Sequence, residues 1–172
     1  MDNNKLFLIV ADIHGSMPAL DKTIDLLRDY KADKLILLGD IFGVDADEMV
    51  EKLNKISDKL VIVKGNNDWY YEPEFAEFDI FEQTYANLNG RTAFICHGHR
   101  LNDMNLSLYG ASVILQGHVH RPFIFKEQGV IRICPGSIAR PRGGSVASYA
   151  IADGEKIQIL SLDGKVIDET IY

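Results

Sequence analysis

Five clusters of aspartate, asparagine and histidine each follow an apolar run that is typical of a buried strand. In open α/β sheets the carboxyl ends of the strands line the ligand-binding crevice. We therefore expect the five clusters to converge on one place, although they lie far apart in the sequence. The clusters are Asp12-Ile13-His14-Gly15, Gly39-Asp40, Gly65-Asn66-Asn67-Asp68, His97-Gly98-His99 and Gln116-Gly117-His118-Val119-His120.

The residue types in these clusters are those that bind divalent transition metals. Carboxylate oxygens, amide oxygens and imidazoles together suit Mn²⁺, Fe²⁺, Ni²⁺ and Zn²⁺. Side chains two residues apart at a strand end point the same way, whereas Cys96 would turn away from the face of His97, so no thiolate belongs to the set. The candidate ligands are Asp12, His14, Asp40, Asn66, His97, His118 and His120.

These seven ligands are too many for one ion and enough for two ions that share a bridging carboxylate. Two-metal sites hold their ions about 3.5–4 Å apart and clamp the attacking and leaving oxygens of a phosphoryl group. A lone aspartate or histidine at a strand end is more often a solvated loop residue. Four of the five histidines belong to the candidate set, however, and chance explains that poorly. The sequence thus predicts a phosphoester hydrolase.

The first half of the chain alternates strand and helix patterns that would position the first three clusters. Ser16 is expected to cap a helix, and a second amphipathic helix is expected over Ala46–Ile56. A βαβαβ arrangement implies a parallel sheet with right-handed crossovers. The expected strands are Leu6–Ala11, Lys34–Leu38 and Leu60–Val63.

The second half of the chain predicts a series of short strands, and Asp-Gly turns separate the last three. Together with the first half, this pattern predicts two sheets packed face to face with helices outside. The expected strands are Thr92–Cys96, Ser112–Leu115, Phe123–Glu127, Val130–Ile133, Ser148–Ala152, Lys156–Ser161 and Lys165–Glu169.

Length and composition set limits on the partners. The 172 residues predict a single domain over residues 1–172, and 47% apolar residues suffice for a full core. The longest apolar run has six residues, where a membrane span needs about 20, so no membrane partner is expected. The net charge of −7 argues against a long nucleic acid. Two cysteines inside apolar strands predict a reduced, cytoplasmic protein.

In order and spacing, the five clusters resemble the signature of the calcineurin-like metallophosphoesterases. The short length, Pro135-Gly136-Ser137 and the hairpin tail resemble the small YfcE-type phosphodiesterase branch of that family. The resemblance implies an α/β (or α+β) metallo-dependent phosphatase fold, a four-layer α/β/β/α sandwich of two mixed sheets flanked by helices. It also implies a small phosphodiester as substrate and two divalent ions, manganese before iron, nickel or zinc.

By the same resemblance, two ions would share Asp40 and activate a bridging hydroxide as the nucleophile. The first ion would be held by Asp12, His14, Asp40 and His120, and the second by Asp40, Asn66, His97 and His118. Catalytic roles are expected for Asp40, Asn66, Asn67, Asp68 and His99. Substrate contacts are expected from Asn67, His99, Ser137, Arg140 and Arg142.

One position departs from the larger superfamily. Many members carry a histidine where this chain has Asn67, and that histidine is thought to protonate the leaving group. An amide side chain transfers no proton near neutral pH. We therefore expect a preference for activated phosphodiesters.

Other functions remain open at this stage. A retromer subunit has this fold with a degraded site and serves as a scaffold, so a non-catalytic interaction module is one alternative. A phosphomonoesterase or protein phosphatase is another, although those commonly keep the histidine that Asn67 replaces. Unpaired strand edges in the β-rich tail would allow a homodimer or higher homo-oligomer.

Aromatic residues after the third cluster are expected to be structural. Trp69, Tyr70 and Tyr71 fit the packing of a loop better than stacking on a nucleobase. Phe75, Phe78 and Phe81, at three-residue spacing, are expected in the core.

Overall fold

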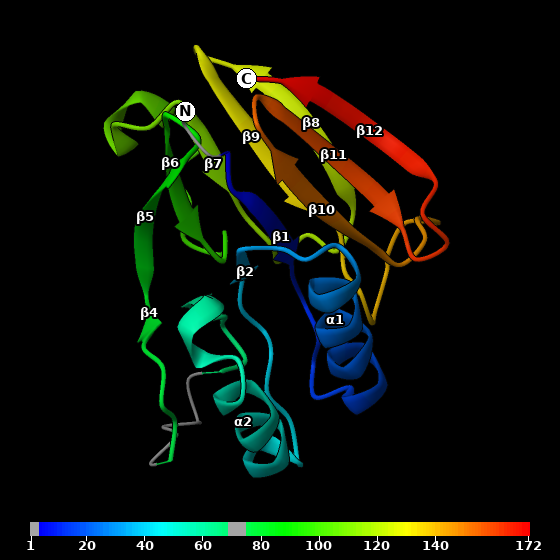
Figure 1. The fold of residues 1–172 in the computed structure, drawn as a ribbon. Helices are drawn as coiled ribbons and strands as arrows, with labels where there is room; N and C mark the ends of the chain where they lie inside the picture. Colours follow the sequence, from blue (N-terminus) through cyan, green and yellow to red (C-terminus); the bar gives the residue numbers. More distant parts are fainter. Residues whose placement is uncertain (1–3, 69–74) are drawn as a thin grey trace.

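The computed structural model describes residues 4–68 and 75–172, which form two β-sheets and two α-helices (Figure 1). The larger sheet contains β1 (Leu6–Val10), β2 (Lys34–Leu37), β3 (Leu60–Val63), β4 (Ile80–Phe81), β10 (Ser148–Asp153), β11 (Lys156–Ser161) and β12 (Val166–Ile171). Their order in space is β12-β11-β10-β1-β2-β3-β4. Strands β1 to β3 run parallel, as the βαβαβ pattern predicts, and β4 joins them in the same direction. The hairpin strands extend the sheet beyond β1, with β10 antiparallel to β1 and each of β11 and β12 antiparallel to the strand before it.

The smaller sheet contains β5 (Gln83–Leu88), β6 (Arg91–Cys96), β7 (Val113–Leu115), β8 (Pro122–Glu127) and β9 (Val130–Pro135). Their order in space is β5-β6-β7-β9-β8. Strands β6, β7 and β9 are parallel, so the ends of β6 and β7 open toward the same side. Both sheets are therefore mixed.

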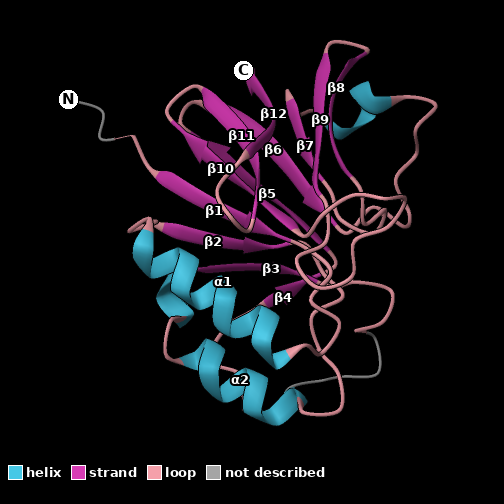
Figure 2. Cartoon of the chain, turned by 90° about the vertical axis from the view of Figure 1, so that its right-hand side faces the viewer, coloured by secondary structure: helices cyan, strands magenta, loops and turns pink. Residues whose placement is uncertain are grey.

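Helices α1 (Met17–Asp29) and α2 (Ala46–Asn54) cover one face of the larger sheet (Figures 1 and 2). The Ser16 hydroxyl accepts a hydrogen bond from the Ala19 amide at 3.3 Å, so the expected helix cap is confirmed. The buried faces of the two helices, with Leu20 on α1 and Met49 on α2 among them, pack against β1 and β2. Two turns of 3₁₀ helix complete the chain, η1 (Ser57–Lys59) and η2 (Leu106–Tyr109).

A second core lies between the two sheets, where Ile9 and Leu38 pack against Ile95 and Leu115 of the smaller sheet. Burying one such side chain contributes about 1.5–3 kcal/mol. The outer face of the smaller sheet is covered by η2, whose Leu106 packs with Phe94, Ile114 and Val130. The four-layer sandwich is present, but its fourth layer is this single 3₁₀ turn and its loop.

The strand ends meet where the loops gather, on one side of the molecule (Figure 2). His97 after β6 contacts the Leu38 carbonyl after β2, and the His118 amide after β7 donates to Asp12 after β1. The predicted convergence of the clusters is therefore observed. No helix among the described residues is long and apolar enough to cross a membrane.

Some sequence-based expectations differ from the structure. Strands β4 and β5 were not predicted, because β4 has two residues and β5 is a polar edge strand. The last strand begins at Val166 and the second helix ends at Asn54. Phe75 and Phe81 are not core residues, since they are 70% and 41% exposed. Trp69, Tyr70 and Tyr71 lie outside the described residues.

Candidate metal centre

The backbone is strained at the strand ends that carry the expected ligands. Eight non-glycine residues of the described chain have positive φ, and five of them are Asp12, His14, Asp40, His118 and His120, with φ between 49° and 68°. Such a conformation is uncommon outside glycine and persists only where surrounding contacts impose it. It turns each chain sharply at the end of its strand and directs the side chains inward.

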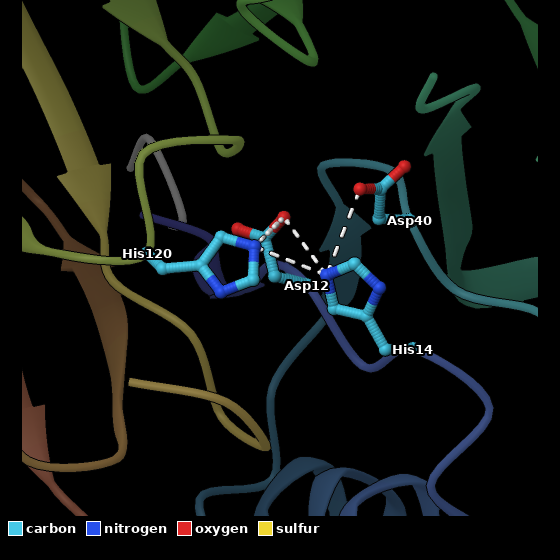
Figure 3. Close-up of side chains that lie close together, drawn as sticks. All are labelled: Asp12, His14, Asp40 and His120. Carbon is cyan, nitrogen blue, oxygen red and sulfur yellow. Dashed lines mark hydrogen bonds and ion pairs between the residues drawn. The ribbon is translucent and has the colours of Figure 1, made fainter. Parts of the chain in front are cut away.

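Four of these side chains form a compact group (Figure 3). Asp12, His14, Asp40 and His120 each offer one ligand atom, and the four atoms lie within 4.8 Å of one another. Asp12 Oδ1 is 3.3 Å from His120 Nε2 and 3.9 Å from His14 Nε2. The two Nε2 atoms are 3.0 Å apart. This is the set expected for the first ion.

The set expected for the second ion lies on the other side of Asp40. His97 Nε2 is 3.4 Å from Asp40 Oδ2 and 3.1 Å from Asn66 Oδ1. The His118 ring lies edge-on to the His97 ring, with 5.1 Å between the centroids. Asp40 Oδ2 is also 3.6 Å from His14 Nε2. One carboxylate oxygen therefore faces both groups.

Backbone carbonyl groups orient two of the imidazoles. His97 Nδ1 donates to the Leu38 carbonyl oxygen and His120 Nδ1 donates to the Arg140 carbonyl oxygen, both at 2.6 Å. A carbonyl only accepts, so Nδ1 carries the proton and Nε2 of the neutral ring presents a lone pair to the carboxylates. Ligating histidines in metal sites are commonly fixed in this way. Sequence reasoning missed both partners, since a carbonyl group leaves no signal in residue type.

The donor set fits divalent cations. Asp12 Oδ1 is buried without a hydrogen-bond partner, an arrangement that a bound cation would satisfy. Burial, only partly offset by His97, raises the pKa of Asp12 to about 7. Burial lowers the pKa of His14 to about 4, so its ring is a neutral ligand at pH 7.

The pKa of Asp40 is shifted in the direction opposite to that of Asp12. Burial alone would raise its pKa, but hydrogen bonding and charge from His97 and hydrogen bonds from Asn67 outweigh it and lower the pKa. Asn67 donates its backbone N–H to Oδ1 at 2.8 Å and its side-chain N–H to Oδ2 at 2.6 Å. For His97 the Asp40 carboxylate outweighs burial and raises the pKa. A proton on His97 Nε2 is thereby favoured, and it would lie where a cation can bind.

Gly65 makes this close packing possible. A Cβ atom there would lie 2.1 Å from Asp40 Oδ1 and 2.2 Å from the Asp40 amide nitrogen. Any side chain would therefore displace the shared carboxylate. Neither described cysteine belongs to the Asp/His group, and burial raises the pKa of Cys96 and of Cys134 to about 12.

The family model described as "Calcineurin-like phosphoesterase superfamily domain" matches residues 6–156. The chain belongs to this superfamily. The resemblance seen in the sequence clusters is thereby confirmed, and a phosphoesterase domain accounts for the two mixed sheets and for an Asp/His group at their strand ends.

Similar phosphoesterases include YfcE of Escherichia coli strain K12, named a phosphodiesterase, which is 29% identical over 93% of this chain and 94% of its own length. The phosphodiesterase MJ0936 of Methanocaldococcus jannaschii is 24% identical over 86% of this chain and 92% of its own. The solved structure of E. coli YfcE superimposes with a TM-score of 0.84 at 27% identity, covering 96% of this chain and 98% of that one.

The fold is also shared with Vps29. The Cryptosporidium parvum protein superimposes with a TM-score of 0.73 at 20% identity and covers 98% of both chains. At that identity the likeness shows the phosphoesterase fold alone.

Two expected site residues have structural tasks in this phosphoesterase domain. The buried Asp68 carboxylate accepts from the amides of Ile41, Phe42 and Gly65 at 2.9–3.0 Å, and so joins the second and third clusters. Ser137 is fully buried, and its hydroxyl donates to the Asp12 carbonyl oxygen at 2.8 Å. The expected substrate contact of Ser137 is therefore corrected, because its hydroxyl is already engaged and out of reach of solvent.

The other expected substrate contacts flank the centre. Arg140 is exposed, with its guanidinium 3.4 Å from the His14 carbonyl oxygen, and Arg142 is exposed nearby, its amide donating to the His120 carbonyl oxygen. His99 is half-buried on the opposite side, its ring 5.4 Å from that of His97 and 6.1 Å from that of His118. Asn67 is exposed beside Asp40. Cationic and neutral donors thus surround the carboxylates and imidazoles.

Proposed function

We propose that this chain is a phosphodiesterase that hydrolyses a small phosphodiester at two divalent ions bridged by Asp40. The observation that carries this proposal is Asp40 Oδ2, which lies 3.6 Å from His14 Nε2 and 3.4 Å from His97 Nε2. A shared carboxylate oxygen between two groups of nitrogen and oxygen ligands is what a two-ion site requires. The likeness to E. coli YfcE, named a phosphodiesterase, supports diester over monoester hydrolysis.

The proposed ligands divide into two sets that share Asp40. The first ion takes Asp12, His14, Asp40 and His120, and the second takes Asp40, Asn66, His97 and His118. Bound there, the ions would polarise a phosphoryl oxygen and lower the pKa of the attacking water.

The chain's own groups hold this arrangement in place. The Leu38 and Arg140 carbonyls fix the two buried histidines with Nε2 toward the centre. Asn67 orients Asp40 through its two hydrogen bonds and, together with the stronger effect of His97, lowers the pKa of that carboxyl. Asp68 positions the second and third clusters through backbone amides, so we assign it a positioning role in place of the expected catalytic one.

Substrate contacts are assigned to the exposed donors. The guanidinium groups of Arg140 and Arg142 suit phosphate oxygens because of their planar fork. Asn67 and His99 lie on the other side of the metal centre and would contact the same phosphate from there. Because Asn67 carries no transferable proton, an activated leaving group is preferred.

Hydrolysis of bis(p-nitrophenyl) phosphate tests the proposal. Activity should appear on addition of Mn²⁺ and fall by at least about a hundredfold in Asp40→Asn, since even groups behind the ligands contribute 10–100-fold. Asp45→Asn is the matched control, because Asp45 is exposed and its side chain makes no helix-cap hydrogen bond. Absence of hydrolysis with Mn²⁺, Fe²⁺, Ni²⁺ and Zn²⁺ alike would overturn the enzyme assignment.

Three finer features belong to the same proposal. Mn²⁺ is the proposed physiological ion because of the resemblance to the phosphodiesterase branch, and the donor set of carboxylates, amide and imidazoles accepts it, as it accepts Fe²⁺, Ni²⁺ and Zn²⁺. A cytoplasmic location is supported by two buried free cysteines. A homo-oligomer is supported by the sheet edges β8 and β12, which carry the exposed apolar residues Phe125, Val166 and Ile171. Metal analysis and light scattering on the purified protein test the first and last of these.

A further inference from the structure

A pocket opens beside the second half of the metal centre. It is lined by Lys64, Gly65, Asn66, Glu82, His99 and Arg100. Asn66 is one of the proposed ligands, so the pocket adjoins the position of the second ion. Glu82, His99 and Arg100 also line a neighbouring pocket that reaches His97. Glu82 and Arg100 therefore stand between two openings next to the same ion position.

The charge of this pocket differs from that of the whole chain. Lys64 and Arg100 contribute two positive charges and Glu82 contributes one negative charge, whereas the chain carries −7. A surplus positive charge in a pocket of an acidic protein attracts anions locally. The described lining residues thus favour a negatively charged group there.

Arg100 lines the pocket and forms one long ion pair, with Glu82. Its guanidinium Nη1 is 3.7 Å from Glu82 Oε2, and the two side chains are 80% and 66% exposed. An ion pair this long and exposed contributes little and exchanges readily. A ligand phosphate, which a guanidinium can bind through two parallel hydrogen bonds, competes well with such a carboxylate.

The fold fixes the backbone that carries Glu82 and Lys64. Glu82 is the single residue between β4 and β5, which belong to different sheets. The Lys64 amide donates to the Phe81 carbonyl oxygen at 2.7 Å, so the chain after β3 is tied to that crossover. The pocket is therefore built on the junction of the two sheets.

Cationic side chains thus lie on both sides of the centre. Arg140 and Arg142 flank His14 and His120, and Lys64 and Arg100 flank the opposite side. A simple diester has one negative charge and needs only one of these pairs.

We propose that the Lys64–Arg100 pocket binds a second anionic group of the substrate, and that the preferred substrate class is a pyrophosphate diester. This inference rests on the proposed function, because it places the scissile phosphate at the two ions. The neighbouring phosphate, one bridging oxygen away, lies between Lys64 and Arg100. The negative charge of Glu82 weakens the binding of this second phosphate.

The reaction of such a substrate is hydrolysis of the phosphoanhydride. The oxygen of water forms a bond to the scissile phosphorus, and the bond from that phosphorus to the bridging oxygen breaks. The bridging oxygen leaves with the second phosphate and the protons of water pass to the products and solvent. Two phosphomonoesters result, and no redox partner is needed.

Calorimetric binding of ADP and AMP to the Mn²⁺-loaded protein tests the pocket directly. The two probes differ by one phosphate, so the ratio of their dissociation constants reports the second anionic position. The intact protein should bind ADP at least about tenfold more tightly than AMP. Arg100→Ala and Lys64→Ala should each reduce that ratio several-fold, and Arg100→Lys should restore part of it.

Glu82→Gln should change the preference for ADP over AMP in the direction opposite to Arg100→Ala and Lys64→Ala. Removing the one carboxylate among the described lining residues should raise the preference for ADP, whereas damage to the fold would lower it. Lys126→Ala is the matched control, since Lys126 is exposed on β8 and lines none of the pockets described above. Its ratio should equal that of the unaltered protein.

The outcomes separate this inference from the proposed function. Equal affinity for ADP and AMP would contradict the proposal that the pocket binds a second phosphate. So would a ratio of their dissociation constants that Arg100→Ala, Lys64→Ala and Glu82→Gln all leave unchanged. Hydrolysis of bis(p-nitrophenyl) phosphate by the same preparation reports the proposed function independently. Because binding is measured without turnover, the pocket is tested even if hydrolysis fails.

Discussion

His120 donates its Nδ1 proton to the Arg140 carbonyl oxygen at 2.6 Å, and its Nε2 faces Asp12 Oδ1 at 3.3 Å. In the neutral ring these are two acceptors pointing at each other. Since Asp12 Oδ1 is also buried without a hydrogen-bond partner, a cation bound between the two atoms would stabilise the pair. At His97 the Nδ1 proton is likewise held by a carbonyl oxygen and Nε2 faces Asp40 Oδ2 at 3.4 Å, where a proton or a cation can lie between the two atoms, so each half of the centre is arranged around a position for positive charge.

The two halves should lose metal separately. His120→Asn removes a ligand of the first set and His97→Asn removes one of the second, while Asp40→Asn affects both. We expect inductively coupled plasma analysis to find about two ions per chain in the unaltered protein, about one in each histidine variant and fewer in Asp40→Asn. Circular dichroism of each variant controls for folding. Full occupancy in all three variants would contradict the ligand assignment.

Metal affinity should rise with pH up to about pH 7. Burial raises the pKa of Asp12 to about 7, so below that pH the carboxyl holds a proton that a divalent ion must displace. His97, whose pKa the Asp40 carboxylate raises, adds a second proton in the same direction. His14, with its pKa lowered to about 4, is already neutral.

One displaced proton with a pKa near 7 corresponds to an affinity about tenfold higher at pH 8 than at pH 6. Titration calorimetry with Mn²⁺ at the two pH values measures the difference. Repetition in buffers of different ionisation enthalpy counts the protons released. Asp12→Asn should weaken binding and release fewer protons. Tighter binding of Mn²⁺ at pH 6 than at pH 8 would contradict the predicted direction of the pH dependence.

The sequence predicted those parts of the site that depend on side-chain type and strand direction. Asp12, His14 and Asp40 converge because the parallel strands β1 and β2 carry their carboxyl ends to one edge, and His120 joins them from the end of β7 in the other sheet. The carbonyl groups of Leu38 and Arg140 could not be predicted in this way, since every residue has the same carbonyl group. Their roles depend on tertiary contacts alone.

The unpredicted parts of the fold have a similar cause. Strand β5 lies at the edge of its sheet and alternates exposed and half-buried residues, so it lacks the apolar run that marks β1 or β2. Phe75 follows a helical spacing in the sequence, but its segment forms no helix and leaves the ring exposed. Periodicity indicates burial only where the corresponding element forms.

Ser137 should affect metal binding rather than substrate binding. Its hydroxyl donates to the Asp12 carbonyl oxygen and accepts from the Arg140 amide, both at 2.8 Å, so it positions a ligand and the residue that orients His120. Ser137→Ala should weaken Mn²⁺ binding by roughly 10–100-fold. It should leave KM for bis(p-nitrophenyl) phosphate unchanged once the protein is saturated with metal.

The matched control for Ser137 is Ser148→Ala. Ser148 is also a fully buried serine, and its hydroxyl donates to the Pro135 carbonyl oxygen without contact to a proposed ligand. Both variants should lose stability in chemical denaturation, but only Ser137→Ala should lose metal affinity. A raised KM for saturated Ser137→Ala would instead support a substrate contact.

Asn67 should limit turnover of substrates with poor leaving groups. Asn67→His places a transferable proton at the rim, and general acid catalysis typically contributes 10²–10⁴-fold. The substitution also removes the amide that donates to Asp40 Oδ2 at 2.6 Å, which offsets part of the gain. We therefore expect the rate for an alkyl aryl phosphodiester with an unactivated leaving group to rise by about tenfold or more.

The same variant should gain little on bis(p-nitrophenyl) phosphate, because p-nitrophenolate leaves without protonation. The ratio of the two rates is thus the informative measurement, since a loss of metal affinity lowers both rates together. Asn67→Gln serves as the control, as it keeps an amide without a transferable proton. An unchanged or lower ratio in Asn67→His would show that Asn67 acts through Asp40 alone, as its two hydrogen bonds to that carboxylate permit.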